Sequence, residues 1–301
     1  MPNPLCLKPT TMTLSRNGLA VHEAPRNTPV RAKVDVLVAG GGPAGVGAAL
    51  AAAAEGADTL LVERYGMLGG LWTAGLVNPF FEAMSNGWLV TALIDRLKAA
   101  GAWRTWKFSH TFDPEVMKRE LELMTQEAGV TLLYHALCVD SIVEDGCLRG
   151  VLIESKAGRE ALLADIIVDC TGDGDVAARA GVPFEFGRLE DGLVQPMTLM
   201  FEVEGVGEYL QTSSGDLYDR MAEVLARQGL DYELPFGRVG YTPSIILLPA
   251  PGRAAVQLTH VYRLNPLDPA DLTRGTVDAR RQAHEAAEIL RHVPGLESLR
   301  L

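Results

Sequence analysis

The stretch that decides the fold is VDVLVAGGGPAGVGAALAAAAEGADTLLVER, residues 34–64. It opens with an apolar run that ends at Val38, a pattern typical of a short buried strand. Three consecutive glycines then lead into an alanine-rich segment, whose small side chains predict a closely packed helix. A second apolar run, TLLVE, ends at Glu63. Strand, glycine turn, helix and strand in this order predict a βαβ unit that binds a dinucleotide.

Gly40, Gly42 and Gly45 fill the G-x-G-x-x-G pattern of a nucleotide-binding turn. The first glycine permits the tight turn, the second lets the backbone approach a pyrophosphate, and the third lets the helix pack against the strand. Backbone amides at the start of the helix face the phosphates, and the helix dipole favours their negative charge. We therefore expect Gly40, Gly42, Pro43, Ala44 and Gly45 to bind the cofactor.

An acidic residue, Glu63, ends the second strand about 20 residues after the first glycine, where the dinucleotide pattern has one. Its carboxylate suits hydrogen bonds to both hydroxyls of an adenosine ribose. It would repel a 2′-phosphate, which argues against NADP at this site. We assign Glu63 and the following Arg64 to cofactor binding.

A second glycine-rich loop, RYGMLGGLWTAG, follows the second strand directly. A simple NAD domain would usually continue into another helix at this point. A loop with so few bulky side chains can lie along the pyrophosphate and ribityl chain of a longer cofactor, so Gly69 and Gly70 join the expected site. The alternative interpretation is an ordinary surface loop.

With these motifs, GGGPAG…VERYGMLGG, the chain resembles the FAD-dependent oxidoreductases of the glutathione-reductase-like superfamily. Within it, the chain is similar to the branch that contains the flavin domain of heterodisulfide reductase A subunits. Further matching stretches are FDPEVMKRELELMTQEAGV (112–130), VDCTGDGDVAARAG (168–181) and QPMTLMFEV (195–203). The resemblance implies FAD as the cofactor, with a flavin that accepts hydride or electrons from a small organic substrate.

The expected fold class is α/β, with a Rossmann-like FAD-binding domain and a smaller α+β substrate region. The segment after Gly129 reads as a β-meander inserted between parallel strands, with turns at Asp145-Gly146 and Ala157-Gly158. The expected domains are an arm over 1–33, the FAD-binding domain over 34–182, a substrate or cap region over 183–275 and a C-terminal helix over 276–301. Relative to the family, the final segment of the FAD domain is expected to be missing.

The stretch DCTGDGDVAARAG, from Asp169 to Gly181, places three carboxylates around two glycines. It departs from a calcium loop, because glycines stand where ligands belong and the closing Glu is missing. We instead expect DIIVDC, at 165–170, to be a buried parallel strand whose carboxyl end faces the cofactor. Asp173 and Asp175 then begin a short helix, as capping acids or as part of the cofactor crevice.

The resemblance implies that Thr171 and Gly172 lie beside the first glycine loop, on the adenosine side of FAD. Gly172 would permit the close approach of the two loops. Cys138, in the meander, and Asp173 complete the cofactor-binding residues that we expect.

Candidate catalytic residues are few. His110, in KFSHTF, and His260, in LTHVYR, are the candidates for proton transfer, with Tyr262 and Arg263 as substrate anchors. The competing interpretation is that both histidines are structural, since neither geometry nor pKa can be read from a sequence. Methionines 84, 197 and 200 are expected to pack in the core.

Two other functions compete with the flavin enzyme. One is a truncated, non-catalytic module that binds FAD or ADP. The other is a protein similar to the thiazole synthases, which share GGGPAG…ER…GG and a comparable length. Those proteins usually carry a Cys or His just after the second glycine loop, whereas this chain has GGLWTAGLVN there.

The composition of the chain limits the kinds of partner that it is expected to bind. The formal net charge is -11, which argues against binding to nucleic acid or to an anionic membrane. No apolar run approaches the roughly 18 residues of a membrane span, and we recognise no signal peptide. We expect a small-molecule substrate, and an electron-transfer partner and a homo-oligomer are also considered.

Four isolated cysteines, at positions 6, 138, 147 and 170, form no C-x-x-C pair. Zinc and iron–sulfur sites are therefore not expected, nor is any other metal site. A hairpin turn over 144–146 would set Cys147 opposite Val143, so a disulfide to Cys138 is not expected. Reduced thiols fit a cytoplasmic location.

Overall fold

The computed structural model describes residues 12–15, 19, 21–23, 25–81, 87–107, 109–207, 214–229, 234 and 243–301. The chain divides into two compact units. The first combines Met1–Leu68 with Leu123–Pro183, and the second combines Gly69–Glu122 with Phe184–Leu301. Neither unit is one continuous piece of the chain, whereas the expected limits at 182 and 275 treat each domain as continuous. Those limits remain a prediction.

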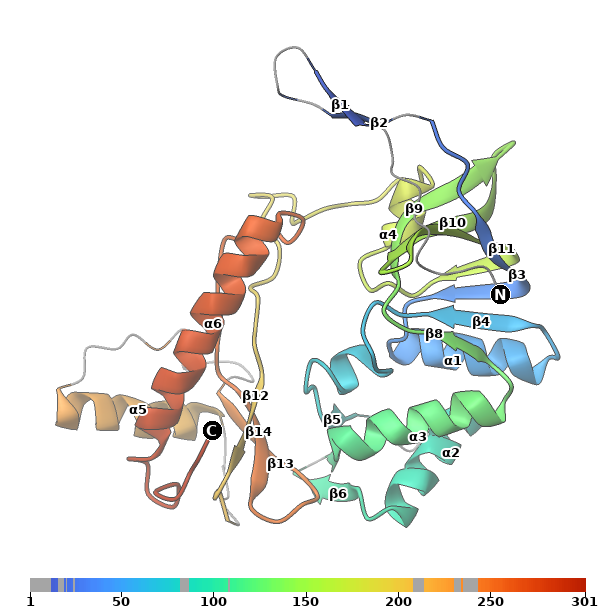
Figure 1. Cartoon of the computed structure of the whole chain (residues 1–301). Coiled ribbons are helices and arrows are strands. Elements are labelled where there is room, and N and C mark those ends of the chain that lie inside the picture. Colours follow the sequence, from blue (N-terminus) through green and yellow to red (C-terminus); the bar gives the residue numbers. More distant parts are fainter. Residues whose placement is uncertain are drawn as a thin grey trace. The chain divides into compact units, whose positions relative to one another are not determined.

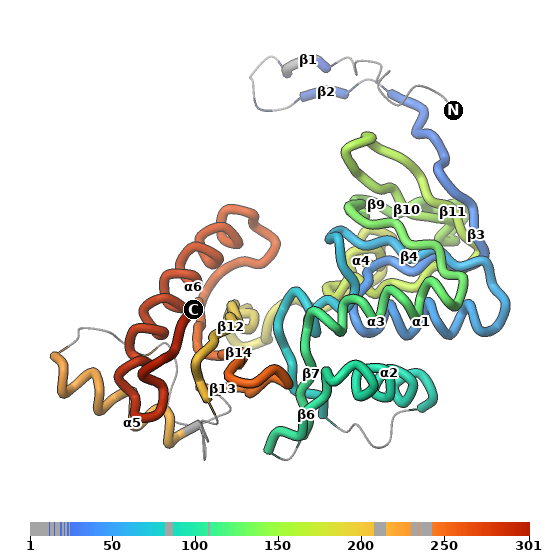
Figure 2. Tube along the Cα trace, turned by 60° about the horizontal axis from the view of Figure 1, so that its bottom comes forward, coloured from blue at the N-terminus to red at the C-terminus, as the bar shows by residue number. Residues whose placement is uncertain are grey.

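The expected βαβ unit is present as β3 (Val30–Ala39), α1 (Pro43–Ala54) and β4 (Thr59–Val62). β3 and β4 run parallel, and all four residues of β4 are buried. Figures 1 and 2 show α1 alongside these strands, and it packs against both. Its small side chains permit this close packing, and Ala49 is fully buried.

The other elements of the first unit are β1 (Met12–Leu14), β2 (Val21–Glu23), β8 (Thr131–Leu133), β9 (Leu137–Glu144), β10 (Cys147–Ser155), β11 (Gly158–Asp169) and α4 (Asp175–Arg179). The main sheet has the order β8-β4-β3-β11-β10-β9, and β1 pairs with β2 separately. β8, β4, β3 and β11 are parallel neighbours, while β9, β10 and β11 form an antiparallel meander. The expected α/β fold, a parallel sheet with an inserted meander, is confirmed.

β11 is one continuous strand, which corrects the expectation of a separate strand over DIIVDC. Its first half pairs antiparallel with β10, and its later residues pair parallel with β3, where Asp169 lies opposite Ala39. The expectation that this strand is buried is also wrong, because Ile166 is 59% exposed. A parallel strand is buried on both faces only where other elements cover both. Here α1 packs mainly on β3 and β4, which leaves the end of β11 with less cover.

The hairpin between β9 and β10 closes at the expected turn, where Asp145 and Gly146 both have positive φ. A two-residue loop pairs the residues that flank it. Cys147 therefore lies opposite Glu144, and the expectation that it faces Val143 is wrong by one position.

The elements assigned to the second unit begin with η1 (Gly70–Trp72), β5 (Pro79–Phe80), α2 (Gly87–Ala99), β6 (Trp103–Trp106), β7 (Ser109–Phe112) and α3 (Pro114–Glu127), which ends in the first unit. They continue with β12 (Phe201–Glu204), α5 (Ser214–Gln228), β13 (Ser244–Leu247), β14 (Arg253–Gln257) and α6 (Pro269–Leu290). Two antiparallel sheets result, β5-β7-β6 and β12-β14-β13.

Helix α3 has a side-chain cap at its start. One carboxylate oxygen of Asp113 accepts hydrogen bonds from the amides of Glu115, at 2.9 Å, and Val116, at 3.2 Å. Pro114 occupies the first helical position, and the chain leaves the helix before Gly129, whose φ is 79°. Proline and glycine therefore mark the two ends of this helix, as is common.

Helices α5 and α6 cover the apolar core of the second unit. Leu217, Met221 and Val224 of α5 are buried there with alanines from the C-terminal part of α6, and Figure 1 shows α5 crossing near that end of α6. α6 begins at Pro269, earlier than the expected limit at 276, because the carboxylate of Asp268 caps it by accepting from the Ala270 amide at 2.9 Å.

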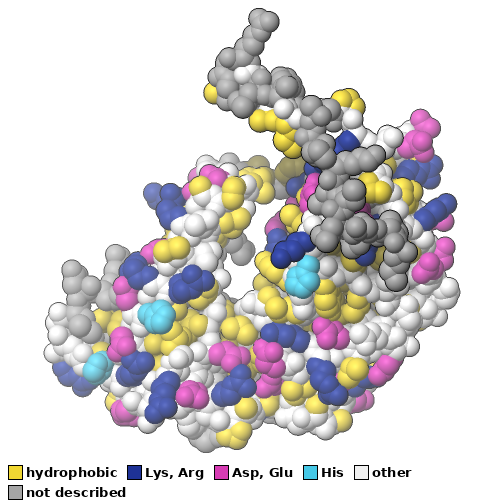
Figure 3. All heavy atoms as spheres, in the orientation of Figure 1, with side chains coloured by type: hydrophobic (Ala, Val, Ile, Leu, Met, Phe, Trp, Pro, Cys, Tyr) yellow, Lys and Arg dark blue, Asp and Glu magenta, His cyan; other side chains and the backbone are white. Residues whose placement is uncertain are grey.

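Charged side chains of both signs are interspersed on the face seen in Figure 3. On α6, Arg281 is exposed and bonds to Asp278 and Glu285 within the same helix. Arg281 therefore lies on a solvated face of the helix. Met197 and Met200 pack against apolar clusters as expected, whereas Met84 lies outside the described residues.

Candidate functional site

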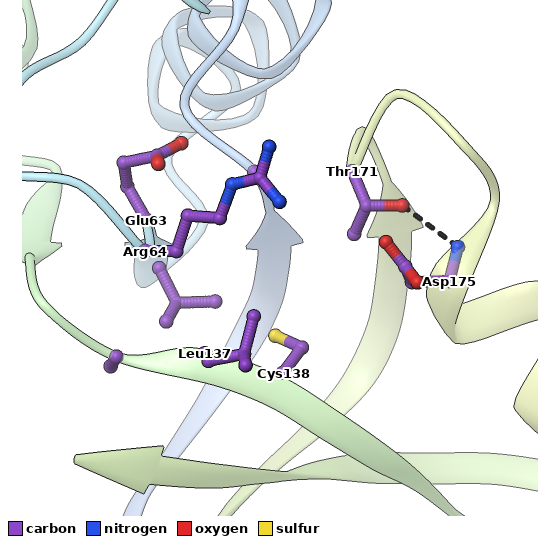
Figure 4. Close-up of a pocket in the computed structure, with 9 residues that line it drawn as sticks. Glu63, Arg64, Leu137, Cys138, Thr171 and Asp175 are labelled. Carbon is purple, nitrogen blue, oxygen red and sulfur yellow. Dashed lines mark hydrogen bonds between the residues drawn. The ribbon is translucent and has the colours of Figure 1, made fainter. Parts of the chain in front are cut away.

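A pocket in the first unit lies where the parallel strands β3, β4 and β11 end. Its lining comes from the glycine turn, the end of β4, the start of β9 and the segment after β11: Gly40, Val62, Glu63, Arg64, Ala136, Leu137, Cys138, Thr171 and Asp175. Figure 4 shows Glu63 and Arg64 on one side, Thr171 and Asp175 on the other, and Cys138 between them. Ligands of open α/β sheets bind at this edge, so we take it as the candidate site.

Two of the motif glycines are required by close packing. Gly40 has φ +101°, and a Cβ there would lie 2.2 Å from the carbonyl oxygen of Cys170. A Cβ on Gly45 would lie 1.8 Å from the carbonyl oxygen of Gly40. The close approach to the end of β11 is therefore made at Gly40. It is not made at Gly172, where a Cβ would meet nothing within 4 Å.

Gly42 differs from these two. A Cβ on it would also meet nothing within 4 Å, so the space beside it is open. Gly42 is the N-cap of α1, and no side chain caps this helix, whereas Asp113 caps α3 and Asp268 caps α6. With Pro43 at the first helical position and Ala44 after it, the first turn of α1 offers backbone amides and a positive helix end to an anion.

Glu63 is 8% exposed and holds the turn together. One of its carboxylate oxygens accepts from the Gly41 amide at 2.7 Å, and the other accepts from the Tyr65 amide at 2.8 Å. A Cβ on Gly41 would lie 3.1 Å from the first of these oxygens. Sequence analysis missed Gly41, although the run of three glycines was a visible signal that this position also lacks room.

Asp169, whose role sequence analysis did not assign, organises the acidic stretch. One of its oxygens accepts from the Thr171 amide at 3.0 Å and the Thr171 hydroxyl at 2.7 Å. The other accepts from the amides of Val176, at 3.0 Å, and Ala177, at 2.9 Å, in the first turn of α4. Burial alone would raise the pKa of Asp169, but these hydrogen bonds lower it below its ordinary value.

The expectation that Asp173 and Asp175 cap α4 is therefore corrected, because Asp169 does so from the end of β11. The Thr171 hydroxyl oxygen accepts from the Asp175 amide at 2.8 Å, which Figure 4 marks, and the Asp175 carboxylate pairs with Arg179. Asp173 is exposed beside Gly172, whose φ is 96°. The three carboxylates thus have separate surroundings.

Cys138 lies on the floor of the pocket. Burial, together with the carboxylates of Asp169 and Asp175, raises the pKa of its thiol to about 12. It is therefore a neutral packing group at neutral pH and no nucleophile. Cys147 and Cys170 are also free thiols, and Cys6 lies outside the described residues.

Arg64 borders the pocket as a cation. Its guanidinium carbon lies 4.7 Å from the centre of the Tyr65 ring, a cation–π distance. Gly69 and Gly70 belong to the second unit and are not among the residues that line this pocket. Gly69 has φ +101°, and a Cβ there would lie 2.5 Å from the Thr73 side chain, so a tight local turn requires this glycine.

The two candidate histidines also belong to the second unit and do not line the pocket. His110, in β7, stacks on Trp103 with ring centres 5.0 Å apart and an interplanar angle of 22°. His260 is stacked on Tyr262 at 5.9 Å, and burial lowers the pKa of its imidazole. The described contacts do not join His110 to His260, and their catalytic roles remain predictions.

The described residues show neither a metal-binding cluster nor a membrane-spanning helix. They contain no group of three or more His, Cys, Asp or Glu side chains arranged to hold a metal ion. Among the helices in this part of the chain, none combines the length and the apolar character that crossing a membrane requires.

A family model described as FAD dependent oxidoreductase matches residues 35–301. Among curated proteins, the chain is 28% identical over 240 residues to the thiamine thiazole synthase of Aeropyrum pernix, covering 74% of this chain and 82% of that protein. It is 30% identical over 150 residues to digeranylgeranylglycerophospholipid reductase 2 of Methanopyrus kandleri, covering 46% of this chain and 37% of that protein.

Solved structures share the fold. A geranylgeranyl bacteriochlorophyll reductase-like protein from Thermoplasma acidophilum has a TM-score of 0.54 at 16% identity, covering 89% of this chain and 64% of that one. The myxobacterial chondrochloren halogenase has a TM-score of 0.53 at 19% identity, covering 88% and 59%. This chain therefore spans less than two thirds of the length of several proteins that it matches.

Proposed function

We propose that this chain, which belongs to the FAD dependent oxidoreductase family, transfers hydride or electrons between a small organic substrate and bound FAD. The observation that carries the proposal is the N-terminus of α1. No side chain caps it, and the space beside Gly42 is open. An anion is the natural partner of such a helix end, and the pyrophosphate of FAD supplies one.

The residues of the first unit fit the adenosine diphosphate half of FAD. Gly40, Gly42, Pro43, Ala44 and Gly45 form the turn that receives the pyrophosphate. Glu63 already accepts two backbone amides, yet each carboxylate oxygen has a further lone pair for a ribose hydroxyl.

The remaining pocket residues hold the site in shape. Arg64 and Cys138 line it, and Thr171 is fixed by Asp169 at its edge. Gly172 and Asp173 follow Thr171 on the exposed side of this edge. Gly69 and Gly70 are proposed as a second cofactor-binding loop, on the sequence pattern alone.

Bound FAD supplies the redox chemistry, since its isoalloxazine accepts and returns a hydride or single electrons. The protein positions it and excludes competing partners. His260 and His110 are retained as candidates for moving a substrate proton, and the lowered pKa of His260 favours its neutral, proton-accepting form at neutral pH.

The narrower assignments belong to this proposal as well. We place the chain near the flavin domain of heterodisulfide reductase A subunits, on the motifs at 112–130, 168–181 and 195–203. Residues 34–182 are taken as the FAD-binding domain and 183–275 as the substrate region. A cytoplasmic location, an electron-transfer partner and a homo-oligomer are consistent with this enzyme class and await measurement.

Likeness to a thiamine thiazole synthase favours a second candidate function, because that match covers most of both proteins. The stretch GGLWTAGLVN argues against it, since it offers neither Cys nor His after the second glycine loop. A non-catalytic module that binds FAD or ADP is the third candidate, and FAD binding without turnover would favour it.

The visible spectrum of the purified chain, with mass spectrometry of whatever heat releases, tests the proposal. The expected result is a flavin spectrum and released FAD. Release of FMN or NADP instead would contradict it.

A matched variant, Glu63→Arg, tests the assigned ribose contact. It should weaken FAD binding, because hydrogen bonds to a carboxylate contribute about 1.5–3 kcal/mol each. Unchanged affinity in that variant would show that Glu63 does not contact the ribose.

A further inference from the structure

A groove in the second unit forms where two segments distant in sequence meet. Gly187, Arg188 and residues 193–196 supply one wall and Tyr262 with Arg263 the other, around a volume of about 1020 Å³. The lining combines two guanidinium groups with a phenol ring and apolar side chains. A volume of this order suits a small organic ligand.

The two walls are held at a fixed spacing by backbone pairing below the groove. Met197 and Val261 exchange two hydrogen bonds, each of 2.9 Å. The fully buried Thr259 hydroxyl accepts from the Leu199 amide and donates to the Leu199 carbonyl, again at 2.9 Å. These two pairs of hydrogen bonds fix the base of the groove, so the site is preorganised for a ligand.

Helix α6 anchors the wall that carries Tyr262 and Arg263. The side-chain amide of Gln282 accepts from the His260 amide at 2.9 Å and donates to the His260 carbonyl at 3.0 Å. Val261 and Leu264 are buried in one cluster with Ala279 of the helix. Because residues 261 and 264 face the helix, the two residues between them are exposed on the groove side, and Tyr262 is 53% exposed.

Arg263 has φ +59°, which is uncommon for a residue with a Cβ. Such a conformation persists only where the surroundings determine it, and functional sites are where it concentrates. Within the described part of the chain, Arg263 makes no ion pair, whereas Arg188 is held by two bonds of 2.7 Å to Asp191. The Asp191 carboxylate therefore bonds to Arg188 and also interacts electrostatically with Arg263. Within the described residues no hydrogen bond engages the Arg263 guanidinium, so its donors can bind an anion.

We propose that this groove binds a small organic carboxylate. The planar fork of Arg263 pairs with the carboxylate, and the Tyr262 ring with Leu193, Val194 and Pro196 contacts the apolar part of the ligand. One open guanidinium beside the Asp191 carboxylate suits a monoanion better than a phosphate dianion. The carboxylate site needs no cofactor, but its use as the substrate site rests on the proposed function.

Calorimetric titration of the full chain with phenylacetate, and with neutral phenylacetamide as its matched control, tests the proposal. Phenylacetate should bind more tightly than the amide. Arg263→Gln should weaken phenylacetate binding about 10- to 100-fold and leave phenylacetamide binding unchanged, because only the charged pair is lost. Arg274→Gln, an exposed arginine of α6 outside the groove, should change neither.

Arg263→Lys keeps the positive charge but loses the planar fork, so its affinity for phenylacetate should lie between those of the wild type and Arg263→Gln. This second variant keeps the test decisive if the Gln variant fails to fold. Equal binding of acid and amide, no binding of phenylacetate, or unchanged binding in both Arg263 variants would overturn the proposal. FAD content, read from the visible spectrum of the same samples, is independent of these results. Carboxylate binding without FAD would refute the proposed function alone, and FAD without carboxylate binding would refute the groove alone.

Discussion

At the scale of one residue, Glu63, which we propose as a ribose contact, also stabilises the fold. Its two oxygens accept from Gly41 and Tyr65, which lie on opposite sides of the chain reversal through α1 and β4. The carboxylate therefore fixes the glycine turn relative to the segment after β4. An acceptor on both oxygens is required, and of the common side chains only a carboxylate offers this at that length.

Glu63→Gln tests this structural role. The amide keeps one acceptor but turns its NH₂ toward a backbone N–H, leaving that buried donor unsatisfied. We expect a loss of about 1–3 kcal/mol in the free energy of unfolding, measured by urea denaturation. Glu55→Gln, the same change at an exposed position, is the control. Equal stability of the two variants would show that the pair of amide bonds contributes little.

Alanine substitutions at Gly42 and Gly45 test ligand binding and packing separately. Gly42→Ala should change stability by no more than about 0.5 kcal/mol, because its Cβ meets nothing and its φ of -69° suits alanine. It should still weaken FAD binding, since the methyl group occupies the space proposed for the pyrophosphate.

Gly45→Ala should lower stability by about 2 kcal/mol or more, because its methyl group would overlap a backbone oxygen. Thermal unfolding without cofactor and FAD titration measure the two effects separately. The interpretation fails if Gly42→Ala unfolds as easily as Gly45→Ala, or if Gly42→Ala binds FAD normally.

At the scale of elements, α4 is a short helix whose N-cap is Gly174, with no capping side chain of its own. The acceptor comes instead from Asp169, at the end of β11. The strand end, the Thr171 turn and the helix start therefore form one hydrogen-bonded assembly beside the pocket. Loss of this carboxylate would free all three together.

Asp169→Asn should lower the free energy of unfolding at neutral pH by about 1 kcal/mol, the usual contribution of a cap. The folded state lowers the pKa of Asp169 below its ordinary value of 3.8. Its contribution is therefore present above pH 3.8 and is lost as pH falls through the lowered value.

Urea unfolding at neutral pH and below pH 3.8 should show the difference between wild type and Asp169→Asn shrinking in acid. Asp173→Asn, at an exposed neighbouring position, is the control and should match the stability of the wild type at neutral pH. A gap between wild type and Asp169→Asn that is independent of pH would contradict the assigned role.

At the scale of the whole molecule, the candidate functions are divided between the two units. The first contains the pocket with the glycine turn, Glu63 and Thr171, whereas the second contains both candidate histidines and the groove at Arg263. The residues of the first unit that we propose for the cofactor would all bind its nucleotide half.

We therefore expect ADP to compete with FAD with an affinity deficit on the order of 1–2 kcal/mol, and FMN to compete poorly because it lacks the adenosine half. Competitive calorimetry on the purified chain measures both. FMN that displaces FAD while ADP does not would contradict the placement of the nucleotide at Glu63. FAD that binds a thousandfold tighter than ADP would show extensive contacts to the flavin ring.

Much of the fold could be read from the sequence because its signals are local. The turn at Gly40–Gly45 and the hairpin at Asp145-Gly146 depend on residues a few positions apart. Apolar periodicity likewise identifies the buried face of an element, as the helical spacing of Leu217 and Met221 in α5 illustrates. It cannot identify which element covers that face, which is why the exposure of Ile166 was missed.

The sequence by itself determined the βαβ unit, the meander and the family, since each depends on residue types at short and fixed spacing. Only the tertiary structure decided that Asp169 caps α4, that Glu63 binds Gly41, and that 187–196 meets Arg263 to form a groove. These contacts join residues that folding brings together from separate stretches of chain. Hydrogen bonds and ion pairs act over a few ångströms, so their partners are set by the path of the backbone and not by distance along the sequence.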